Sequence, residues 1–374
     1  MKSPATEMLF HDQPAIVRQE LLLGGRHVSG LTLWKFDMRV GSALLRMGGI
    51  GGVHTDPAHR NKGLAARVMV ESMQYMLTQG YDVSLLFGIT DFYHRWHFAP
   101  AMAAPSLAIE TRNAERAEAR YKVRPAEDKD LPVIRRIYER SNAGRTGTVV
   151  RPARLWKNFR KGSTWGTKVL PFVVTQGRRP VAYFVLDDKK IETIVCEVGA
   201  LRPDAFSTIV NACALQAVAR RDEYVRFCVP PDHPFLQHAI LYGAEAQQFY
   251  PRANNAMVAL VNQRTTLEKM LPEFTARLRR SCFCDWSGRI SITTDLENTD
   301  LVVRHGEASL ARRPGKSDGR LNGSQEGLGQ LLMGYRSVDA VLADPGVRLS
   351  GKVQAVLEVL LPKGFPFIWP ADHF

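Results

Sequence analysis

Hydrophobic and polar residues alternate along the chain in a pattern that predicts strands and helices in mixed order. Alternating runs at 15–23 and 27–36 predict two strands near the start, and an apolar run at 83–88 predicts a third. Between them, apolar residues at helical spacing predict a helix over 64–77 that ends before Gly80. Because the alternation continues to the last residues, we expect an α/β (α+β) fold class with mixed sheets flanked by helices.

Later segments repeat this alternation and divide the chain into three parts. In the middle part, strands are predicted at 121–126, 169–175, 181–186, 191–198 and 224–229, and helices at 131–138 and 203–221. In the last part, helices are predicted at 265–280, 324–333, 337–343 and 353–361, and strands at 286–293 and 301–304. A charged stretch at 111–120 suits a connector. We therefore expect domains at 1–120, 121–262 and 263–374.

The composition is typical of a globular protein and excludes several classes. Of the 374 residues, 45% are hydrophobic and 23% are charged. No uncharged apolar run approaches the length of a transmembrane helix. The first residues lack the apolar core of a signal peptide, and five cysteines are too few for a disulfide scaffold. We therefore expect a cytoplasmic protein.

The formal net charge of +13 at pH 7 indicates an anionic partner, which would be nucleic acid, a membrane or a phosphorylated cofactor. Basic residues are spread along the chain in short pairs such as Arg220-Arg221, without an RNA-recognition, zinc-finger or KH motif. We therefore expect no nucleic acid and no membrane as a partner. Cys282 and Cys284 have no second cysteine pair or histidine cluster nearby, so no metal site is expected.

The clearest chemical signal lies at the joint between the predicted strand that ends at Thr55 and the helix that follows. A helix N-terminus offers free N–H groups and a partial positive charge, which together bind phosphate well. Arg60 and Lys62 add positive charge, while Gly63 and Ala65 allow a ligand to approach the main chain closely. An ordinary strand–turn–helix joint is the alternative interpretation.

The full string V-x-T-x-P-x-x-R-x-x-G-x-A resembles the acetyl-CoA-binding motif of the GNAT acetyltransferase superfamily. The resemblance implies acetyl-CoA as co-substrate and no metal. It also implies that main-chain groups of Val53 and Thr55 hold the pantetheine arm and the thioester carbonyl. The pyrophosphate would be held by the main chain of the loop formed by Arg60, Asn61, Lys62, Gly63, Leu64 and Ala65.

A second segment, F-Y-H-R-W-H-F, is similar to the F-Y-x-x-x-G-F segment of many GNAT enzymes. By this resemblance, Tyr93 lies near the CoA sulfur and protonates the leaving thiolate. A tyrosine that only packs between Phe92 and Trp96 is the alternative. His97 replaces the usual glycine, so the local turn is uncertain from sequence, and His94 and His97 are weaker candidates for the acceptor pocket.

Over nearly its whole length, the chain resembles the Eis (enhanced intracellular survival) subgroup, which joins an active GNAT domain, a degenerate one and a sterol-carrier-like domain. The second segment has 197–203 at the corresponding joint and lacks the R/Q-x-x-G-x-G/A loop, so we expect no CoA there. In this subgroup the terminal carboxylate acts as the base, a role that falls on Phe374. The aromatic residues of 365–374 predict that this tail is docked. Compared with the subgroup, the first domain is expected to be N-terminally short.

Together these features predict an N-acetyltransferase that transfers acetyl from acetyl-CoA to a primary amine by direct attack in a ternary complex. The acceptor would be a small molecule or a lysine side chain, which the sequence does not identify. The resemblance further implies a homo-oligomer, with a hexamer as the expected form. A lipid or sterol carrier and a non-catalytic acyl-CoA sensor are the alternatives.

Overall fold

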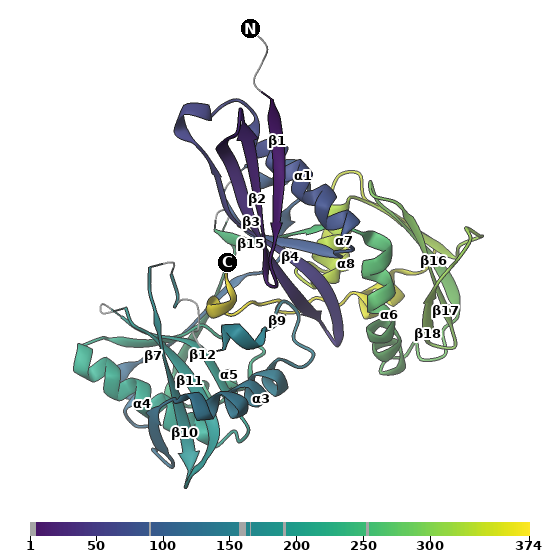
Figure 1. Cartoon of the computed structure of the whole chain (residues 1–374). Helices are drawn as coiled ribbons and strands as arrows, with labels where there is room; N and C mark the ends of the chain where they lie inside the picture. Colours follow the sequence, from purple (N-terminus) through teal and green to yellow (C-terminus); the bar gives the residue numbers. More distant parts are fainter. Residues whose placement is uncertain (1–4, 90, 157–161, 165, 190–191, 252–253) are drawn as a thin grey trace.

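The structure is a computed structural model that describes residues 5–89, 91–156, 162–164, 166–189, 192–251 and 254–374. Its strands form three mixed sheets with helices packed against them, which confirms the predicted fold class (Figure 1). Most strands of each sheet come from one of the three predicted parts of the chain, taken in order.

The first sheet has eight strands in the order β1-β2-β3-β4-β5-β15-β6, with β9 paired to β3. Its strands are β1 (Thr6–Asp12), β2 (Ile16–Leu23), β3 (Arg26–Val40), β4 (Ala43–Thr55), β5 (Val83–Gly88), β6 (Ala99–Pro100), β9 (Val149–Val150) and β15 (Asn255–Leu260). Only β4 and β5 run parallel, and helix α1 (Leu64–Thr78) connects them. Val68, Met69 and Met76 of α1 are buried against the sheet, as the helical spacing predicts. The described residues before β2 form strand β1, which the pattern did not predict.

The second sheet repeats the central unit of the first. Its order is β14-β7-β13-β12-β11-β10-β8. The strands are β7 (Ala104–Glu110), β8 (Lys122–Pro125), β10 (Val169–Gln176), β11 (Arg179–Asp187), β12 (Thr193–Ala200), β13 (Tyr224–Phe227) and β14 (Ala244–Phe249). Helix α4 (Ala205–Arg220) connects the parallel pair β12 and β13, as α1 connects β4 and β5. Helices α3 (Leu131–Asn142) and α5 (Pro234–Ala239) complete this domain.

The first two domains exchange strands, so the predicted boundaries at 120 and 262 do not follow the sheets. β7 lies before residue 120 but pairs with β13 and β14 of the second sheet. β15 lies before residue 262 but returns to the first sheet between β5 and β6. A local hydrophobic pattern predicts that a strand forms but not which distant strand it pairs with, which is why the exchange was missed.

The third sheet, in the order β18-β17-β16-β19-β20, packs with its helices against the first domain (Figure 1). Its elements are α6 (Gln263–Arg279), β16 (Gly288–Thr293), β17 (Asn298–Arg304), β18 (Glu307–Leu310), β19 (Gly319–Asn322), α7 (Gln325–Leu332), α8 (Val338–Leu342), β20 (Arg348–Ser350) and α9 (Gln354–Leu360). One apolar core joins both domains, with Met38 and Leu45 of the first sheet beside Leu267 and Met270 of α6. A cavity within the third domain measures only about 10 Å³. This is the space of about one water molecule, and the lipid-carrier alternative is not tested by it.

Smaller predictions agree in part. α7 ends at Leu332, and Gly334 follows the C-cap Met333 with a φ of +67°, the left-handed conformation expected after a helix. The connector at 111–120 is helical only in α2 (Thr111–Ala114). The carboxylate of Asp130, at the start of α3, makes no hydrogen bond to the helix main chain and accepts from Arg124 and from the main chain of Glu127.

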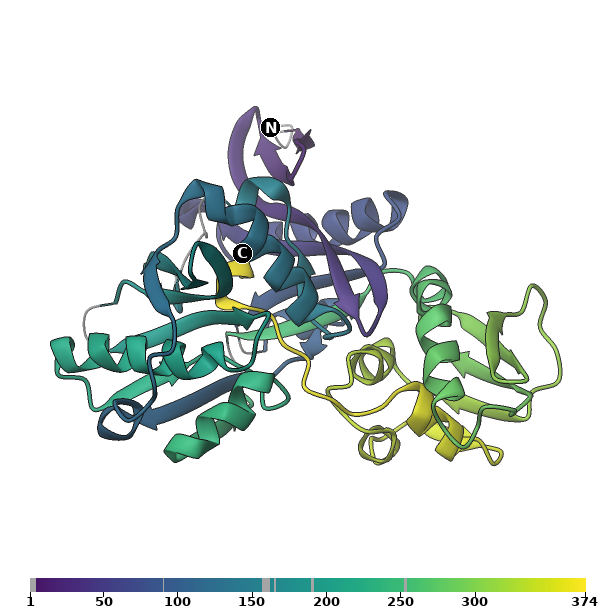
Figure 2. The same ribbon diagram turned by 90° about the horizontal axis from the view of Figure 1, so that it is seen from below.

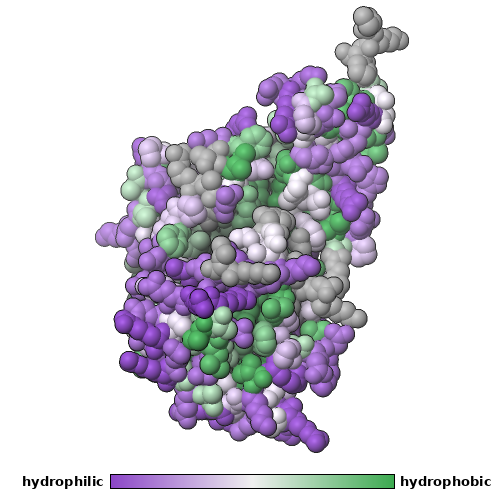
Figure 3. All heavy atoms as spheres, turned by 90° about the vertical axis from the view of Figure 1, so that its left-hand side faces the viewer, coloured by the Kyte–Doolittle hydropathy of each residue, from purple (hydrophilic) through white to green (hydrophobic). Residues whose placement is uncertain are grey.

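The following observations concern the predictions about a membrane, a metal and a homo-oligomer, and they test none of the three. No helix of the described residues is long and apolar enough to cross a membrane, and those residues contain no histidine, cysteine and carboxylate cluster suited to a metal. Figure 3 shows one face on which hydrophobic side chains lie in separate groups between hydrophilic ones. Leu215 and Leu241 are among the exposed apolar residues of the second domain. The homo-oligomer therefore stays a prediction.

Candidate active site

The joint between β4 and α1 forms the expected cradle for a phosphate group. A short 3-10 turn follows Thr55, and Asn61 and Gly63 then take φ values of +59° and +73°. Gly63 stands at the N-terminus of α1, where no side chain caps the first helical N–H groups. These donors are therefore available to an anion. A Cβ on Gly63 would meet nothing within 4 Å, so the space above this turn is open.

This cradle faces a cavity of about 310 Å³. Its lining includes six of the predicted CoA-binding residues, which are Thr55, Arg60, Asn61, Gly63, Leu64 and Ala65. Lys62 does not line it, since its ammonium group donates to the main-chain oxygen of Ala58 at 3.3 Å. Arg95 lies on the opposite wall and stacks on Phe92 and Trp96. The sequence analysis missed this second cation, because only the fold brings it opposite the helix N-terminus.

Next to the cradle, β4 separates from β5. The parallel register between the two strands ends at Ile50 and Leu86, although β4 continues to Thr55. On its other side, β4 has a bulge opposite Gly30 and Thr32 of β3. The main-chain N–H and C=O groups of β4 that follow Ile50 and point toward β5, including those around Val53, are therefore not paired with β5. A ligand that lies in this opening can pair with the strand main chain.

Tyr93 faces the same opening from the 3-10 turn Tyr93–Trp96. Burial raises the pKa of its phenol, so the hydroxyl stays protonated at neutral pH and keeps a proton to donate. His97, which replaces the usual glycine, takes φ +62° and so supplies the left-handed turn that a glycine would. Its ring contacts Glu326 of α7 at 2.8 Å. His97 thus faces the third domain and not the acceptor pocket, and His94 is exposed.

A pocket of about 410 Å³ brings together residues that are far apart in sequence. Val53 of β4, Tyr93 and the terminal Phe374 all line it. The carboxyl carbon of Phe374 lies 3.0 Å from the place where a Cβ of Gly51 would be, directly at the separation of β4 from β5. The structure therefore places the predicted donor tyrosine, the predicted main-chain site and the predicted carboxylate around one space, which we call the central pocket.

Two glycines of β4 make room for the terminal residue. A Cβ on Gly49 would lie 2.5 Å from the Phe374 ring, and a Cβ on Gly51 would meet its carboxyl group. The ring itself is buried and packs against Phe36 and Phe87 at centroid distances of 5.8 and 5.5 Å. Any other residue at Gly49 would displace the Phe374 ring, so this part of the strand is shaped for the tail.

The tail runs from the third domain into the space between the other two (Figure 2). Its residues alternate between two cores, as an extended chain does. Phe367, Trp369 and Ala371 join the core of the second domain, whereas Ile368 and Phe374 join the core shared by the first and third. The tail therefore packs against the core of the second domain and against the core that the first and third domains share.

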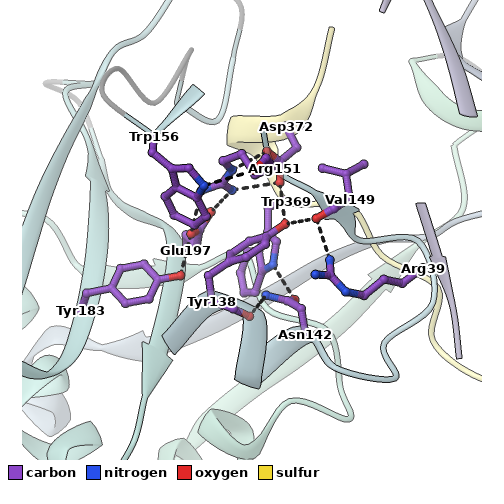
Figure 4. Close-up of polar contacts among 10 residues, drawn as sticks. All are labelled: Arg39, Tyr138, Asn142, Val149, Arg151, Trp156, Tyr183, Glu197, Trp369 and Asp372. Atoms are coloured by element: carbon purple, nitrogen blue, oxygen red, sulfur yellow. Dashed lines mark hydrogen bonds and ion pairs between the residues drawn. The ribbon is translucent and has the colours of Figure 1, made fainter. Parts of the chain in front are cut away.

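A buried ion cluster fixes the tail two residues before its end (Figure 4). Arg151 donates to Asp372 at 2.7 and 2.9 Å and to Glu197 at 2.7 Å, and all three side chains are at most 1% exposed. The hydroxyls of Tyr138 and Tyr183 donate to the two carboxylates at 3.1 and 2.7 Å. Burial, and then the nearby carboxylates, raise the pKa of both tyrosines, so they remain donors.

In the second domain, the same cluster occupies the position that corresponds to the opening between β4 and β5 of the first domain. The parallel register of β12 with β13 ends at Val195, and Glu197 follows two residues later, within the corresponding opening. At the start of α4, the carboxylate of Asp204 accepts from Arg202 and Tyr121. An acid at this helix N-terminus disfavours a phosphate there, which agrees with the prediction that the second domain binds no CoA.

Sequence reasoning did not identify Arg151, Glu197 or Asp372 as a group. Asp372 lies in the tail whose docking was predicted, and Glu197 in the joint that was judged degenerate. Arg151 carries no local signal, since it stands in a loop between β9 and a short turn. Only a co-varying or long-range constraint would have connected the three.

Comparison with known proteins agrees with this geometry. Residues 5–101 match the family described as the acetyltransferase (GNAT) domain. This part of the chain is therefore similar to the acetyltransferase domains of that family. No curated protein matches the sequence.

Solved structures resemble the whole chain in fold. A GCN5-related N-acetyltransferase from Kribbella flavida has 15% sequence identity and a TM-score of 0.72, with 96% of this chain and 87% of that chain covered. A protein from Enterococcus faecalis described as a probable N-acyltransferase has 15% identity and a TM-score of 0.76, with 96% and 90% covered. Eis1 from Mycobacterium abscessus has 14% identity and a TM-score of 0.65, with 99% and 100% covered. At these identities the likeness concerns the fold alone.

We predict that Asp372→Asn loosens the tail. It removes one of the two carboxylates that face Arg151 and places an amide N–H₂ against a guanidinium donor. Breaking a buried ion pair in this way lowers the free energy of unfolding by about 3–5 kcal/mol, to be measured by chemical denaturation. Asp232→Asn is the matched control, because Asp232 pairs with Arg145 while its own side chain is 46% exposed, and such pairs contribute about 0–1 kcal/mol. Equal losses in the two variants would contradict the prediction.

Proposed function

We propose that this protein is an acetyl-CoA-dependent N-acetyltransferase that acts on a primary amine by direct attack. One observation carries the proposal. The central pocket is lined by the opening of β4, by Tyr93 and by the terminal Phe374. The phosphate cradle at the start of α1 lies beside it along the same strand. The GNAT match over residues 5–101 supports the use of acetyl-CoA. The cytoplasmic location, the sterol-carrier-like nature of the third domain and the hexamer remain predictions.

In the proposed reaction, each residue handles one bond or one proton. The Phe374 carboxylate takes a proton from the acceptor ammonium group, and the free amine attacks the thioester carbonyl. Main-chain N–H groups around Val53 stabilise the oxyanion. As the new C–N bond replaces the C–S bond, Tyr93 donates its proton to the leaving thiolate. The products are the N-acetylated amine and CoA.

A covalent acetyl-cysteine route is disfavoured by the cysteine nearest to this site. Cys228 is the cysteine among the described residues that lines the cavity adjoining the central pocket. Burial raises the pKa of its thiol to about 12. Because the thiolate is the nucleophilic form, this residue is almost wholly unreactive at neutral pH. Direct transfer in a ternary complex is therefore the simpler course.

We predict that Gly63→Asp abolishes acetyl-CoA binding. The new carboxylate would stand in the open space above the turn, against the pyrophosphate. Two like charges 4 Å apart repel by about 4 kcal/mol at an effective dielectric constant of 20, so the dissociation constant measured by calorimetry should rise at least about a hundredfold. Gly63→Asn is the control, since it has the same shape and similar tolerance of the positive φ without the charge. An unchanged affinity in folded Gly63→Asp would remove the cofactor assignment.

We predict that Tyr93→Phe lowers kcat while leaving the KM for acetyl-CoA nearly unchanged. The ring still packs and only the proton donor is lost, which costs about 10²–10⁴-fold in rate. Steady-state kinetics with a good acceptor measure the effect. Tyr75→Phe serves as the control. The hydroxyl of Tyr75, on α1, donates to Asp12 of β1 at 3.5 Å, and Tyr75 lines neither cavity. Full activity of Tyr93→Phe would assign the residue to packing.

We predict that two residues added after Phe374 sharply reduce kcat. The extension converts the carboxylate into a neutral amide and pushes the new charge away from the pocket, so the loss should reach at least about a hundredfold. Deleting Phe374 should act similarly, because the new carboxylate would fall about 3.3–3.6 Å short. The same two residues added at the N-terminus are the control. A C-terminally extended protein with full activity would show that the base lies elsewhere.

A further inference from the structure

A second cavity adjoins the central pocket and has no role in the reaction as described so far. It measures about 180 Å³ and lies where β5 and β15 of the first sheet approach the end of β13 and the tail. It shares Phe87, Ser163, Asn254 and His373 with the central pocket. The two cavities are therefore continuous, and we call the smaller one the annex.

The order of the three spaces along the molecule assigns the annex to the acceptor side. The annex shares four lining residues with the central pocket and none with the cavity at the cradle. Acetyl-CoA reaches the central pocket from the cradle, along β4. The acceptor amine must approach the same carbonyl from another direction, and the annex is the continuous space that remains.

The chemistry of the annex is apolar. Apart from the four shared residues, its lining consists almost entirely of hydrocarbon side chains, among them Met102, Ala103, Phe367 and Ile368. No Asp or Glu is found among the described residues that line the annex or the central pocket. The anionic group there is the carboxylate of Phe374.

The acid that contacts the lining residue Ser163 is Asp187, and its carboxylate holds a loop. Asp187 is fully buried, and its carboxylate accepts from the main chain and the hydroxyl of Ser163 at 2.5 and 2.6 Å. It also accepts from Thr167 at 2.9 Å and from the main chain of Lys189 at 2.7 Å. It therefore holds the loop that carries Ser163 and does not face the acceptor. In sequence, the neighbouring residues 157–161 and 252–253 contain Lys and Arg but no Asp or Glu.

This charge pattern separates two classes of acceptor. A polyamine or an aminoglycoside carries several ammonium groups, of which the Phe374 carboxylate can pair only one. The remaining charges would enter apolar space in a protein with a formal net charge of +13, without partners to replace their water. A monoamine with a hydrocarbon body brings one charge to the carboxylate and buries its apolar surface in the annex.

We propose that the acceptor is a monoamine with an apolar body of about aromatic size, its nitrogen at the Phe374 carboxylate and its body in the annex. This inference rests on the proposed transfer reaction and specifies its substrate class. The ammonium group loses one proton to the carboxylate, and the free amine forms the C–N bond as the C–S bond breaks. The second proton of the nitrogen replaces the one that Tyr93 gives to the sulfur, so the products are a neutral amide and the CoA thiol.

The test compares acceptors with the full-length protein, carrying no C-terminal addition, at fixed acetyl-CoA. The panel contains 2-phenylethylamine, ethylamine, spermidine and kanamycin. The proposal expects kcat/KM for 2-phenylethylamine to exceed that for each of the others at least about tenfold, since apolar contacts discriminate on that scale. A preference for spermidine or kanamycin would overturn the proposal and leave the transferase function standing. Acetylation of none of them, with acetyl-CoA still bound, would overturn both.

Two variants locate the preference in the annex. Ala103→Leu reduces the free space, so the ratio of kcat/KM for 2-phenylethylamine to that for ethylamine should fall at least about tenfold. Asn254→Asp adds a charge at the rim with no change of shape, and both residues tolerate the φ of +57° found there. It should raise kcat/KM for spermidine relative to 2-phenylethylamine. Unchanged ratios in both variants, with the KM for acetyl-CoA retained, would place the acceptor outside the annex.

Discussion

The arrangement of the whole chain depends on one buried guanidinium. Arg151 lies between the carboxylates of Asp372 and Glu197, and the three side chains have almost no contact with water. Burial raises the pKa of Glu197 while Arg151 opposes this rise, so a charge at this position is costly unless its lone pairs have donors. The hydroxyls of Tyr138 and Tyr183 supply the further donors, so the cluster is satisfied only when all of its members are in place.

These charges come from three different parts of the fold. Arg151 directly follows β9, which pairs with β3 of the first sheet. Glu197 belongs to β12 of the second sheet, and Asp372 to the tail that leaves the third domain. This ion cluster can therefore form completely only when the three parts are correctly assembled. The second domain lacks the R/Q-x-x-G-x-G/A loop, and Glu197 in the opening of its sheet binds the arginine that holds the tail.

The sequence predicted local structure well because local structure depends on spacing and turn chemistry. The joint at Gly63, the helix that follows it and the docking of an aromatic tail were all readable from neighbouring residues. The exchange of β7 and β15 was not, since a strand's hydrophobic pattern does not specify its partner. For the same reason Arg95 was missed at the cradle and Arg151 at the tail: each acts through residues that are distant in sequence.

The glycines of β4 show why site residues are hard to assign from a motif alone. The CoA loop is preceded by the run Gly48-Gly49-Ile50-Gly51-Gly52, which a motif alone would assign to cofactor binding. In the structure, a side chain at Gly49 would strike the Phe374 ring, and one at Gly51 its carboxyl group. The strand that leads to the cradle is therefore fitted to the opposite end of the chain. The terminal carboxyl group can lie at the opening of β4 only because Gly49 and Gly51 have no side chains in its way, so the strand and the tail depend on each other's sequence.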